Sequence, residues 1–305
     1  MSGLLKRAIL GAATNGAVTS FVEKHGMKLG AARFVAGETL DECVVVLRRL
    51  NEQGLRANTT LLGEDTVDAA SAKAVVSSYE EILDRIAAEK LRVNVALKLT
   101  HLGLGLGEDV AFENVARLVD HAAERDNFIR IDMERSDVLD ATLRIFRRLR
   151  ETRDNVGCVL QSYLYRTPHD LDELLPLGLN VRLVKGAYLE PPGIAYPEKE
   201  DVDAAYVRLL EKALREAEHV GVATHDEKLI EHTIQFTERE GIPGERFGFQ
   251  MLYGVRPRLQ LDLAARGYDV LVATPYGPAW YPYLMRRMAE RPANLLFVLQ
   301  NLTRR

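Results

Sequence analysis

Cysteine is scarce in this sequence, since Cys43 and Cys158 are the only two among 305 residues. They lie far apart in the chain, within stretches that are typical of a helix and of a buried strand. We therefore expect two reduced thiols in the core rather than a disulfide. Reduced thiols fit a reducing compartment, and a cytoplasmic location is expected.

Long apolar runs and an excess of one charge are missing too. No run approaches the roughly 18 uninterrupted apolar residues that a membrane-spanning helix needs. The formal net charge of −4, without a basic stripe interleaved with aromatics, argues against a nucleic-acid partner. Residues 1–30 carry no acid before Glu23, as in some targeting peptides, but Asn15 interrupts their apolar stretch and no clear cleavage site follows. An amphipathic N-terminal arm is the favoured interpretation.

The remaining composition is that of a globular protein with a sizeable core, at 47% hydrophobic and 28% charged residues. From residue 57 onward, short apolar runs alternate with longer stretches of helical periodicity. The runs are rich in β-branched and aromatic residues and are short enough to be buried strands. They occupy residues 58–64, 92–99, 127–134, 156–163, 180–187, 220–226, 246–252 and 268–275.

The intervening stretches predict amphipathic helices, most clearly over 68–90 and 201–220. Ser136, Thr167 and Asp226 lie where further helices should begin. A strand followed by a helix, eight times over, requires parallel strands joined by crossover helices. Eight is also the number of strands that closes a (β/α)8 barrel.

A doubly wound open sheet is the alternative α/β architecture. It is disfavoured because no G-x-G-x-x-G motif follows the first predicted strand. The segment "GLGLGE" at 103–108 has the wrong spacing and follows the second strand, and it is interpreted as a flexible loop. We therefore predict an α/β protein with a (β/α)8 TIM barrel over residues 46–305, preceded by a helical arm over residues 1–45.

Chemistry in such barrels takes place at the C-terminal ends of the strands. The polar and aromatic residues that the sequence places there are Glu64, Lys98, Asp132, Glu134, Gln161, Arg182, Lys185, Tyr188, Thr224, His225, Asp226 and Gln250. Taken singly, several have a purely structural interpretation. Lys98 and Asp132 would form an ion pair, and Asp226 would cap a helix. Glu64 would be an ordinary acid at a helix N-terminus, where the helix dipole favours a negative charge. As a set at corresponding positions, these residues indicate a functional site.

The residue types in this set restrict its chemistry. A transition metal would want two or more His or Cys ligands, and the set offers one His and no Cys, so no metal is expected. A serine hydrolase would need a G-x-S-x-G elbow, which is missing. A Schiff base on Lys98 or Lys185 remains open. The excess of cationic and amide donors suits a large anionic cofactor together with a small carboxylate.

At 182–188 the stretch "RLVKGAY" resembles the proline dehydrogenase family, flavin-dependent enzymes that oxidise L-proline. Further segments agree with the family in order and spacing, at 62–64, 96–104, 129–135, 160–167, 222–226, 247–254 and 283–290. The resemblance implies a distorted (β/α)8 barrel that holds FAD non-covalently, with the last helix over the barrel mouth. The implied reaction transfers a hydride from proline C5 to flavin N5 and yields Δ1-pyrroline-5-carboxylate, the first step of proline catabolism to glutamate. The chain is similar to one module of the bifunctional proline-utilising enzymes, and we expect it to be monofunctional.

The resemblance also implies roles for individual residues, none of them a dedicated acid or base. FAD contacts are implied for Gln161, Arg182, Lys185, Ala187, Thr224 and His225. The proline carboxylate is implied to bind Lys98, Arg286 and Arg287, and the proline ring to contact Asp132, Tyr188, Leu252 and Tyr283. Glu64 and Glu290 match carboxylates that hold the two arginines. Some members line the pocket with a tyrosine at the end of strand 8, where this sequence has Ala273 or Thr274 and a displaced Tyr276.

The partners that the resemblance implies are L-proline, a membrane quinone that reoxidises the flavin through peripheral contact with the inner face of the membrane, and a pyrroline-5-carboxylate dehydrogenase that takes the product. Other functions remain as alternatives. They are a flavin reductase of the methylenetetrahydrofolate type, a Schiff-base aldolase, and a non-catalytic barrel that binds FAD or an amino acid. The Arg286–Arg287 pair on the last predicted helix argues against the reductase and the aldolase.

Overall fold

Eight parallel strands form a closed barrel, in which each strand pairs with the next and β8 pairs with β1. The computed structural model describes residues 31–63 and 65–290, and the side chains of the last helix only as far as residue 285. The strands are β1 Arg56–Leu61, β2 Val93–Leu97, β3 Ile129–Ile131, β4 Val156–Gln161, β5 Asn180–Val184, β6 His219–Ala223, β7 Phe247–Leu252 and β8 Val270–Tyr276. All eight predicted strands are confirmed, and the open-sheet alternative is wrong.

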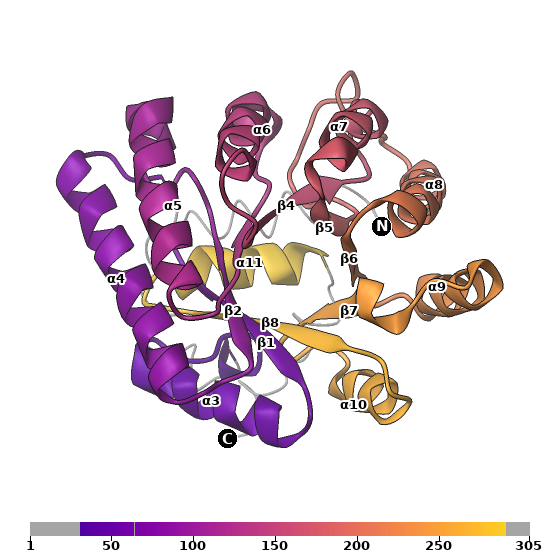
Figure 1. Ribbon diagram of the computed structural model, residues 1–305, viewed down its shortest axis with the longest axis horizontal. Coiled ribbons are helices and arrows are strands. Elements are labelled where there is room, and N and C mark those ends of the chain that lie inside the picture. The colour runs from indigo at the N-terminus through magenta and orange to yellow at the C-terminus, as the bar shows by residue number, and fades with distance from the viewer. Residues whose placement is uncertain (1–30, 64, 291–305) are drawn as a thin grey trace.

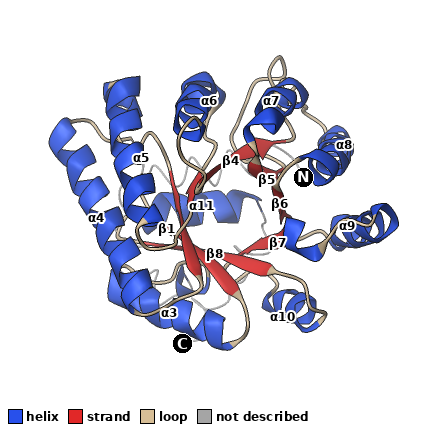
Figure 2. Cartoon of the chain, in the orientation of Figure 1, coloured by secondary structure: helices blue, strands red, loops and turns tan. Residues whose placement is uncertain are grey.

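A ring of α-helices surrounds the barrel, as Figures 1 and 2 show. The helices are α3 Leu40–Glu52, α4 Ala69–Ala88, α5 Glu108–Ala123, α6 Ser136–Arg150, α7 Thr167–Leu174, α8 Lys199–Glu216, α9 Glu227–Glu240, α10 Pro257–Ala265 and α11 Trp280–Glu290. Short 3-10 turns are η1 Ala31–Arg33, η2 Leu104–Leu106, η3 Leu175–Leu177 and η4 Gly244–Arg246. Residues 103–108, interpreted as a loop, contain η2 and the first residue of α5. Within the described ranges, no helix is long and apolar enough to cross a membrane.

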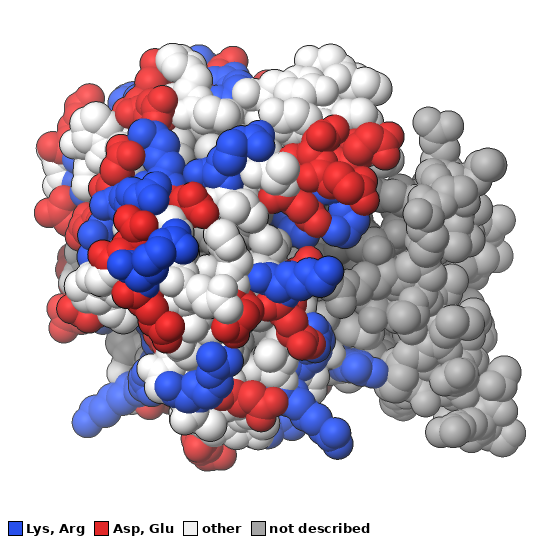
Figure 3. All heavy atoms as spheres, turned by 90° about the vertical axis from the view of Figure 1, so that its right-hand side faces the viewer, with Lys and Arg blue, Asp and Glu red and all other residues white. Residues whose placement is uncertain are grey.

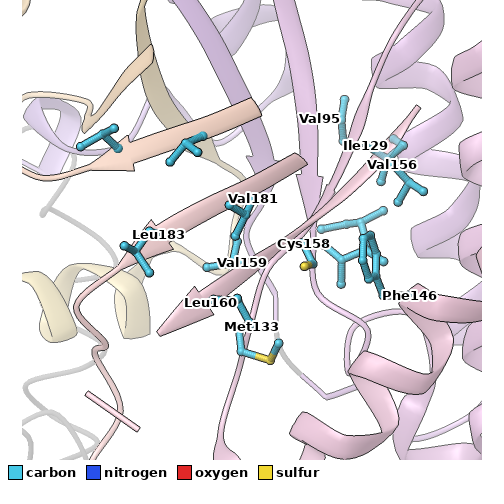
Figure 4. Close-up of a cluster of buried hydrophobic side chains, with 14 of the residues drawn as sticks. Val95, Ile129, Met133, Phe146, Val156, Cys158, Val159, Leu160, Val181 and Leu183 are labelled. Atoms are coloured by element: carbon cyan, nitrogen blue, oxygen red, sulfur yellow. The ribbon is translucent and has the colours of Figure 1, made fainter. Parts of the chain in front are cut away.

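The core lies between the barrel wall and the helices. Figure 4 shows strand side chains such as Val95, Ile129 and Val156 facing Phe146 of α6. Cys158 lies in the same cluster and, like Cys43 on α3, is a buried free thiol, as predicted. Burial raises the pKa of each thiol to about 12, because an ionised sulfur would lose its hydration there. Both cysteines are therefore inert packing residues.

Most charged residues lie on the outside. Salt bridges join neighbouring outer helices, for example Arg117 to Glu80 and Arg144 to Glu108. On the face shown in Figure 3, side chains of both signs are interspersed over the described surface. Exposed pairs of this kind contribute only about 0–1 kcal/mol each to stability.

The predicted helix starts hold, although their caps differ. Asp226 caps α9, since its carboxylate accepts a hydrogen bond from the Lys228 N–H at 3.1 Å. Helices α6 and α7 begin at Ser136 and Thr167, but neither residue is an N-cap. The Ser136 N–H and hydroxyl instead donate to Glu190, at 2.8 and 2.6 Å. A carboxylate from the β5–α8 loop thus satisfies the first turn of α6.

Helix α3 runs across residue 45, where the arm was predicted to end. It packs on β1 and β8, and its Cys43 and Leu47 are fully buried in the barrel core. Residues 1–30 lie outside the described residues, so the N-terminal arm stays a prediction.

The last helix lies over the barrel mouth, as expected. Figure 1 shows α11 across the opening that the strands enclose. Trp280 and Leu284 of α11 share a small apolar cluster with Leu62 after β1 and Val255 after β7. Phe34 from the segment before α3 joins this cluster, and Trp280 Nε1 donates to Glu38 Oε1 at 2.7 Å. The helix is therefore held both by strand-end loops and by the segment that precedes the barrel.

Candidate active site

A cavity of about 510 Å³ opens at the C-terminal ends of the strands, which is a typical volume for a small-molecule site. It is lined by the predicted site residues Lys98, Asp132, Gln161, Arg182, Lys185, Ala187, Tyr188, Thr224, His225, Asp226, Gln250, Leu252 and Tyr283, whereas the predicted strand-end acid Glu134 does not line it. Another cavity, of about 650 Å³, lies at the N-terminal ends of the strands. The chemistry of barrels belongs to the C-terminal ends, so the 510 Å³ cavity is the candidate site.

Four predicted site residues cannot be placed in this cavity. Glu64 and the side chains of Arg286, Arg287 and Glu290 lie outside the described residues. Tyr283, one helical turn before Arg286, does line the cavity. The roles of the four therefore stay predictions.

Arg182 is the centre of the site. Its guanidinium is only 8% exposed and donates to three oxygens: Gln250 Oε1 at 2.5 Å, Asp132 Oδ1 at 2.9 Å and Asn58 Oδ1 at 3.0 Å. Burial lowers the pKa of Arg182, and the Asp132 charge opposes that shift. The ion pair between Lys98 and Asp132 that the sequence allowed is not formed, because Asp132 pairs with Arg182.

Lys98 is half-buried and contributes a cation to the cavity. Within the part of the chain that the structure describes, its ammonium has no hydrogen-bond or ion-pair partner. A nearby acid is Glu134, whose carboxylate is held by the Thr100 hydroxyl at 2.7 Å. Burial raises the pKa of Glu134, and the Lys98 charge acts in the opposite sense. Lys98 is therefore placed to bind an anionic ligand.

Lys185 has a different environment. Its ammonium lies 2.5 Å from Asp203 and 3.7 Å from Asp226, and Lys199 pairs with Asp203 as well. Lys185 is thus already paired with two carboxylates, whereas a Schiff-base nucleophile must be free to attack a carbonyl carbon. The aldolase alternative loses support at this residue.

His225 joins two walls of the cavity. Its Nε2 accepts a hydrogen bond from the backbone N–H of Leu252 at 2.9 Å, so the proton of the neutral ring is assigned to Nδ1. Arg256 donates to the His225 carbonyl at 2.9 Å. The neighbouring Thr224 hydroxyl accepts from the Asp226 N–H at 3.1 Å. The end of β6 is thereby fixed against the end of β7.

Gln161 carries an unused acceptor. The residue is 3% exposed and lines the cavity, and its Oε1 is buried without a hydrogen-bond partner among the described residues. A buried carbonyl oxygen without a donor is destabilising, so a ligand N–H would complete it. A flavin ring carries such an N–H, and the nearby cations suit the phosphates of a flavin nucleotide. The residues present therefore fit a flavin nucleotide.

The turn after β5 depends on Gly186. Its φ of +118° is unfavourable for other residues, and a Cβ there would lie 2.5 Å from Cγ of Tyr163. This turn places Ala187 and Tyr188 at the wall of the cavity.

The end of β8 contributes small side chains to the cavity. Ala273 and Thr274 line the cavity, whereas Tyr276 is 4% exposed and lies in the core between barrel and helices. No tyrosine from β8 therefore narrows the site.

Asn58 and Lys199 are among the lining residues that the sequence analysis missed. Asn58 of β1 is 1% exposed and bonds Arg182 from inside the barrel. Lys199 stands at the start of α8, on the rim of the same cavity. Asn58 and Thr60 both line the cavity, but Thr59 between them is polar as well, so the sequence of β1 carries no alternation that marks the inward face.

A closed (β/α)8 barrel with a cationic, amide-rich cavity at its C-terminal mouth defines a TIM-barrel enzyme. The family model described as proline dehydrogenase matches residues 43–300. The chain is 38% identical to proline dehydrogenase 1 of Bacillus subtilis strain 168, over 99% of this chain and 100% of that protein. It is 40% identical to proline dehydrogenase of Deinococcus radiodurans, over 98% of each chain. The chain belongs to the proline dehydrogenase family.

A solved structure agrees with this assignment. Proline utilization A from Bdellovibrio bacteriovorus, in a crystal structure of the protein inactivated by N-propargylglycine, superimposes with a TM-score of 0.81 at 25% identity. The match covers 90% of this chain and 34% of that one, so the chain spans about a third of the bifunctional-type relative. A flavin is the cofactor that this family implies.

Proposed function

We propose that this chain oxidises L-proline to Δ1-pyrroline-5-carboxylate with FAD bound non-covalently at the barrel mouth. The observation that carries the proposal is the cavity itself. It combines a clamped guanidinium at Arg182, a cation at Lys98 without a partner among the described residues, and an unused buried acceptor at Gln161. These groups match a nucleotide cofactor and a small carboxylate.

FAD would be held from β4, β5 and β6. Gln161, Arg182 and Lys185, which line the cavity, would contact the isoalloxazine and nearby FAD atoms, and the Ala187 backbone would contact the flavin from the β5 turn. Thr224 and His225 would contact the ribityl and pyrophosphate portion. When bound, the flavin accepts the two electrons and the hydrogen that leave proline C5.

Proline would be held by charge and shape. Lys98 binds its carboxylate together with Arg286 and Arg287 of α11, which Glu64 and Glu290 support. Asp132, Tyr188, Leu252 and Tyr283 enclose the ring. No side chain need act as a strong base, since correct placement of C5 can lower the activation barrier by several kcal/mol. The chain's task is to orient the substrate and exclude water.

The electrons would pass to a membrane quinone, through transient peripheral contact with the membrane. The product would pass to a pyrroline-5-carboxylate dehydrogenase. These two partners complete the proposed reaction sequence.

The cheapest test is the spectrum of the purified protein. We expect yellow protein whose flavin bleaches when L-proline is added under anaerobic conditions. A colourless preparation that takes up no FAD would refute a flavoenzyme. Flavin that a reduced nicotinamide bleaches, that methylenetetrahydrofolate reoxidises, and that proline does not bleach would identify the folate reductase. Borohydride trapping of a carbonyl substrate on Lys98 would identify an aldolase.

A further inference from the structure

Arg182 donates hydrogen bonds to residues on or directly after three other strands of the barrel. Of its five N–H groups, Nε–H goes to Gln250 on β7, one on Nη1 goes to Asp132 after β3 and one on Nη2 goes to Asn58 on β1. Each guanidinium nitrogen thus has its own acceptor, so the plane of the group cannot rotate. Two N–H groups have no acceptor among the described residues, at a side chain that lines the cavity.

Gln250 is itself held in place by a glycine. A Cβ at Gly221 on β6 would lie 2.6 Å from Cδ of Gln250. The bare backbone at 221 therefore leaves the space that the Gln250 amide occupies while its Oε1 accepts from Arg182. The φ of Gly221 is not in the left-handed region, so its lack of a side chain serves this packing alone.

Asn58 is oriented by a second amide. Its Nδ2 donates to Asn94 Oδ1 at 2.6 Å, which assigns its own Oδ1 as the acceptor for Arg182. Asn94 lies on β2, at the position that pairs with Asn58 in the strand register. The amide of Asn58 therefore cannot flip without losing both hydrogen bonds.

The charges of these acceptors matter as much as their positions. Among the three acceptors, Asp132 carries a negative charge, while Gln250 and Asn58 are neutral. Neutral amides orient the cation without cancelling more of its charge. A fixed cation with free N–H groups stabilises negative charge that develops on a neighbouring ring.

We propose that Gln250 and Asn58 are positioning residues that orient the Arg182 guanidinium toward the flavin and thereby set the reduction potential of the flavin. This inference rests on the proposed function. Gly221 contributes to the same positioning of Arg182, because it makes room for the Gln250 amide.

The test compares Gln250→Met with Gly221→Ala. The first variant removes the acceptor, and the second displaces it while leaving both Gln250 and Arg182 in the chain. Methyl contact with the end of a flexible side chain is tolerated by a shift of that side chain, so Gly221→Ala should fold. We expect both to lower the flavin midpoint potential, by about 30 mV for each tenfold loss of preference for the reduced form. The rate of flavin reduction by L-proline should fall roughly tenfold to a hundredfold.

The double variant separates positioning from general damage. If Gly221→Ala acts through Gln250, it should shift the potential no further in the Gln250→Met background. Asn180→Leu is the matched control, since it takes an amide acceptor from the buried Arg130, which does not line the cavity. Arg130 keeps its bonds to two backbone carbonyls, and the flavin potential should stay at the wild-type value.

Potentials measured with redox dyes do not depend on proline turnover. A wild-type flavin that proline fails to reduce would therefore refute the proposed substrate and leave this comparison intact. Wild-type potentials in both Gln250→Met and Gly221→Ala would overturn the positioning role. A shift in Asn180→Leu equal to theirs would overturn it as well.

Discussion

The imidazole of His225, at the end of β6, accepts a hydrogen bond from the backbone N–H of Leu252, at the end of β7, over 2.9 Å. In the proposed function these two residues face different ligands, His225 the cofactor and Leu252 the proline ring. One hydrogen bond therefore couples the cofactor wall to the substrate wall.

Replacement of His225 should weaken both ligands. His225→Ala removes the acceptor of the Leu252 N–H, and we expect the FAD Kd and the proline KM each to rise roughly tenfold. Fluorescence titration of the apoprotein and steady-state kinetics with saturating FAD measure the two effects. Thr224→Ala is the control, since the Thr224 hydroxyl bonds the Asp226 N–H rather than Leu252 and its loss should change FAD binding alone. An unchanged proline KM in His225→Ala would contradict the coupling.

Loss of a cation from α11 should separate substrate from cofactor. Arg286→Met should raise the proline KM about 100-fold, because a charge-assisted carboxylate contact is lost, and should leave the FAD Kd within about threefold. Arg208→Met removes an exposed arginine of α8 and should change neither value. Equal losses of proline and FAD affinity in Arg286→Met would show that the arginine serves the cofactor.

The end of β8 should control the size of the ring that is accepted. Ala273→Tyr fills space in the cavity, so we expect kcat/KM to fall more for hydroxyproline than for proline. The ratio of kcat/KM for hydroxyproline to kcat/KM for proline should fall about tenfold. Ala273→Ser adds little volume and should leave the ratio near the wild-type value. A ratio that stays at the wild-type value in Ala273→Tyr would mean that the ring points elsewhere.

Acid should destabilise the fold through His219 at the start of β6. Burial, aided by the Arg130 charge, lowers the pKa of His219 to about 4, and its Nδ1 is buried without a partner among the described residues. The unfolded chain therefore binds the proton more readily. The contribution of His219 to the free energy of unfolding is present above pH about 6.5 and is lost as the pH falls toward 4, by at most about 3 kcal/mol.

Urea denaturation between pH 7 and 4 measures this contribution. His219→Leu should flatten the decline in the free energy of unfolding over that range. His169→Leu is the control, because the His169 side chain is 72% exposed. A decline in His219→Leu as steep as in the wild type would contradict the role of this histidine.

The sequence predicted the barrel and most of the cavity for one physical reason. In a closed parallel barrel the C-terminal ends of all strands meet, so Lys98, Gln161 and Thr224 converge although 126 positions separate the first from the last. Recognition of strands in the right order was therefore enough to place them in one cavity.

The hydrogen-bond partners were beyond sequence reasoning. Arg182 is long enough to reach several strands, and its choice of Asp132 and Asn58 depends on the curvature of the closed barrel. In β1 the run "RANTTL" is polar on both faces, so alternation does not reveal that Asn58 faces inward while Thr59 bonds toward Cys43 of α3. The cap of α6 by Glu190 joins residues 54 positions apart, which local patterns cannot show.

The bond between Trp280 and Glu38, with the apolar cluster around it, makes the segment before α3 a mechanical tether for α11. Any movement of α11 that admits proline must therefore break these contacts or move the segment before α3 together with the helix. A change in the segment before α3 would therefore reach, through Glu38 and Phe34, the same helix that bears the predicted carboxylate-binding arginines.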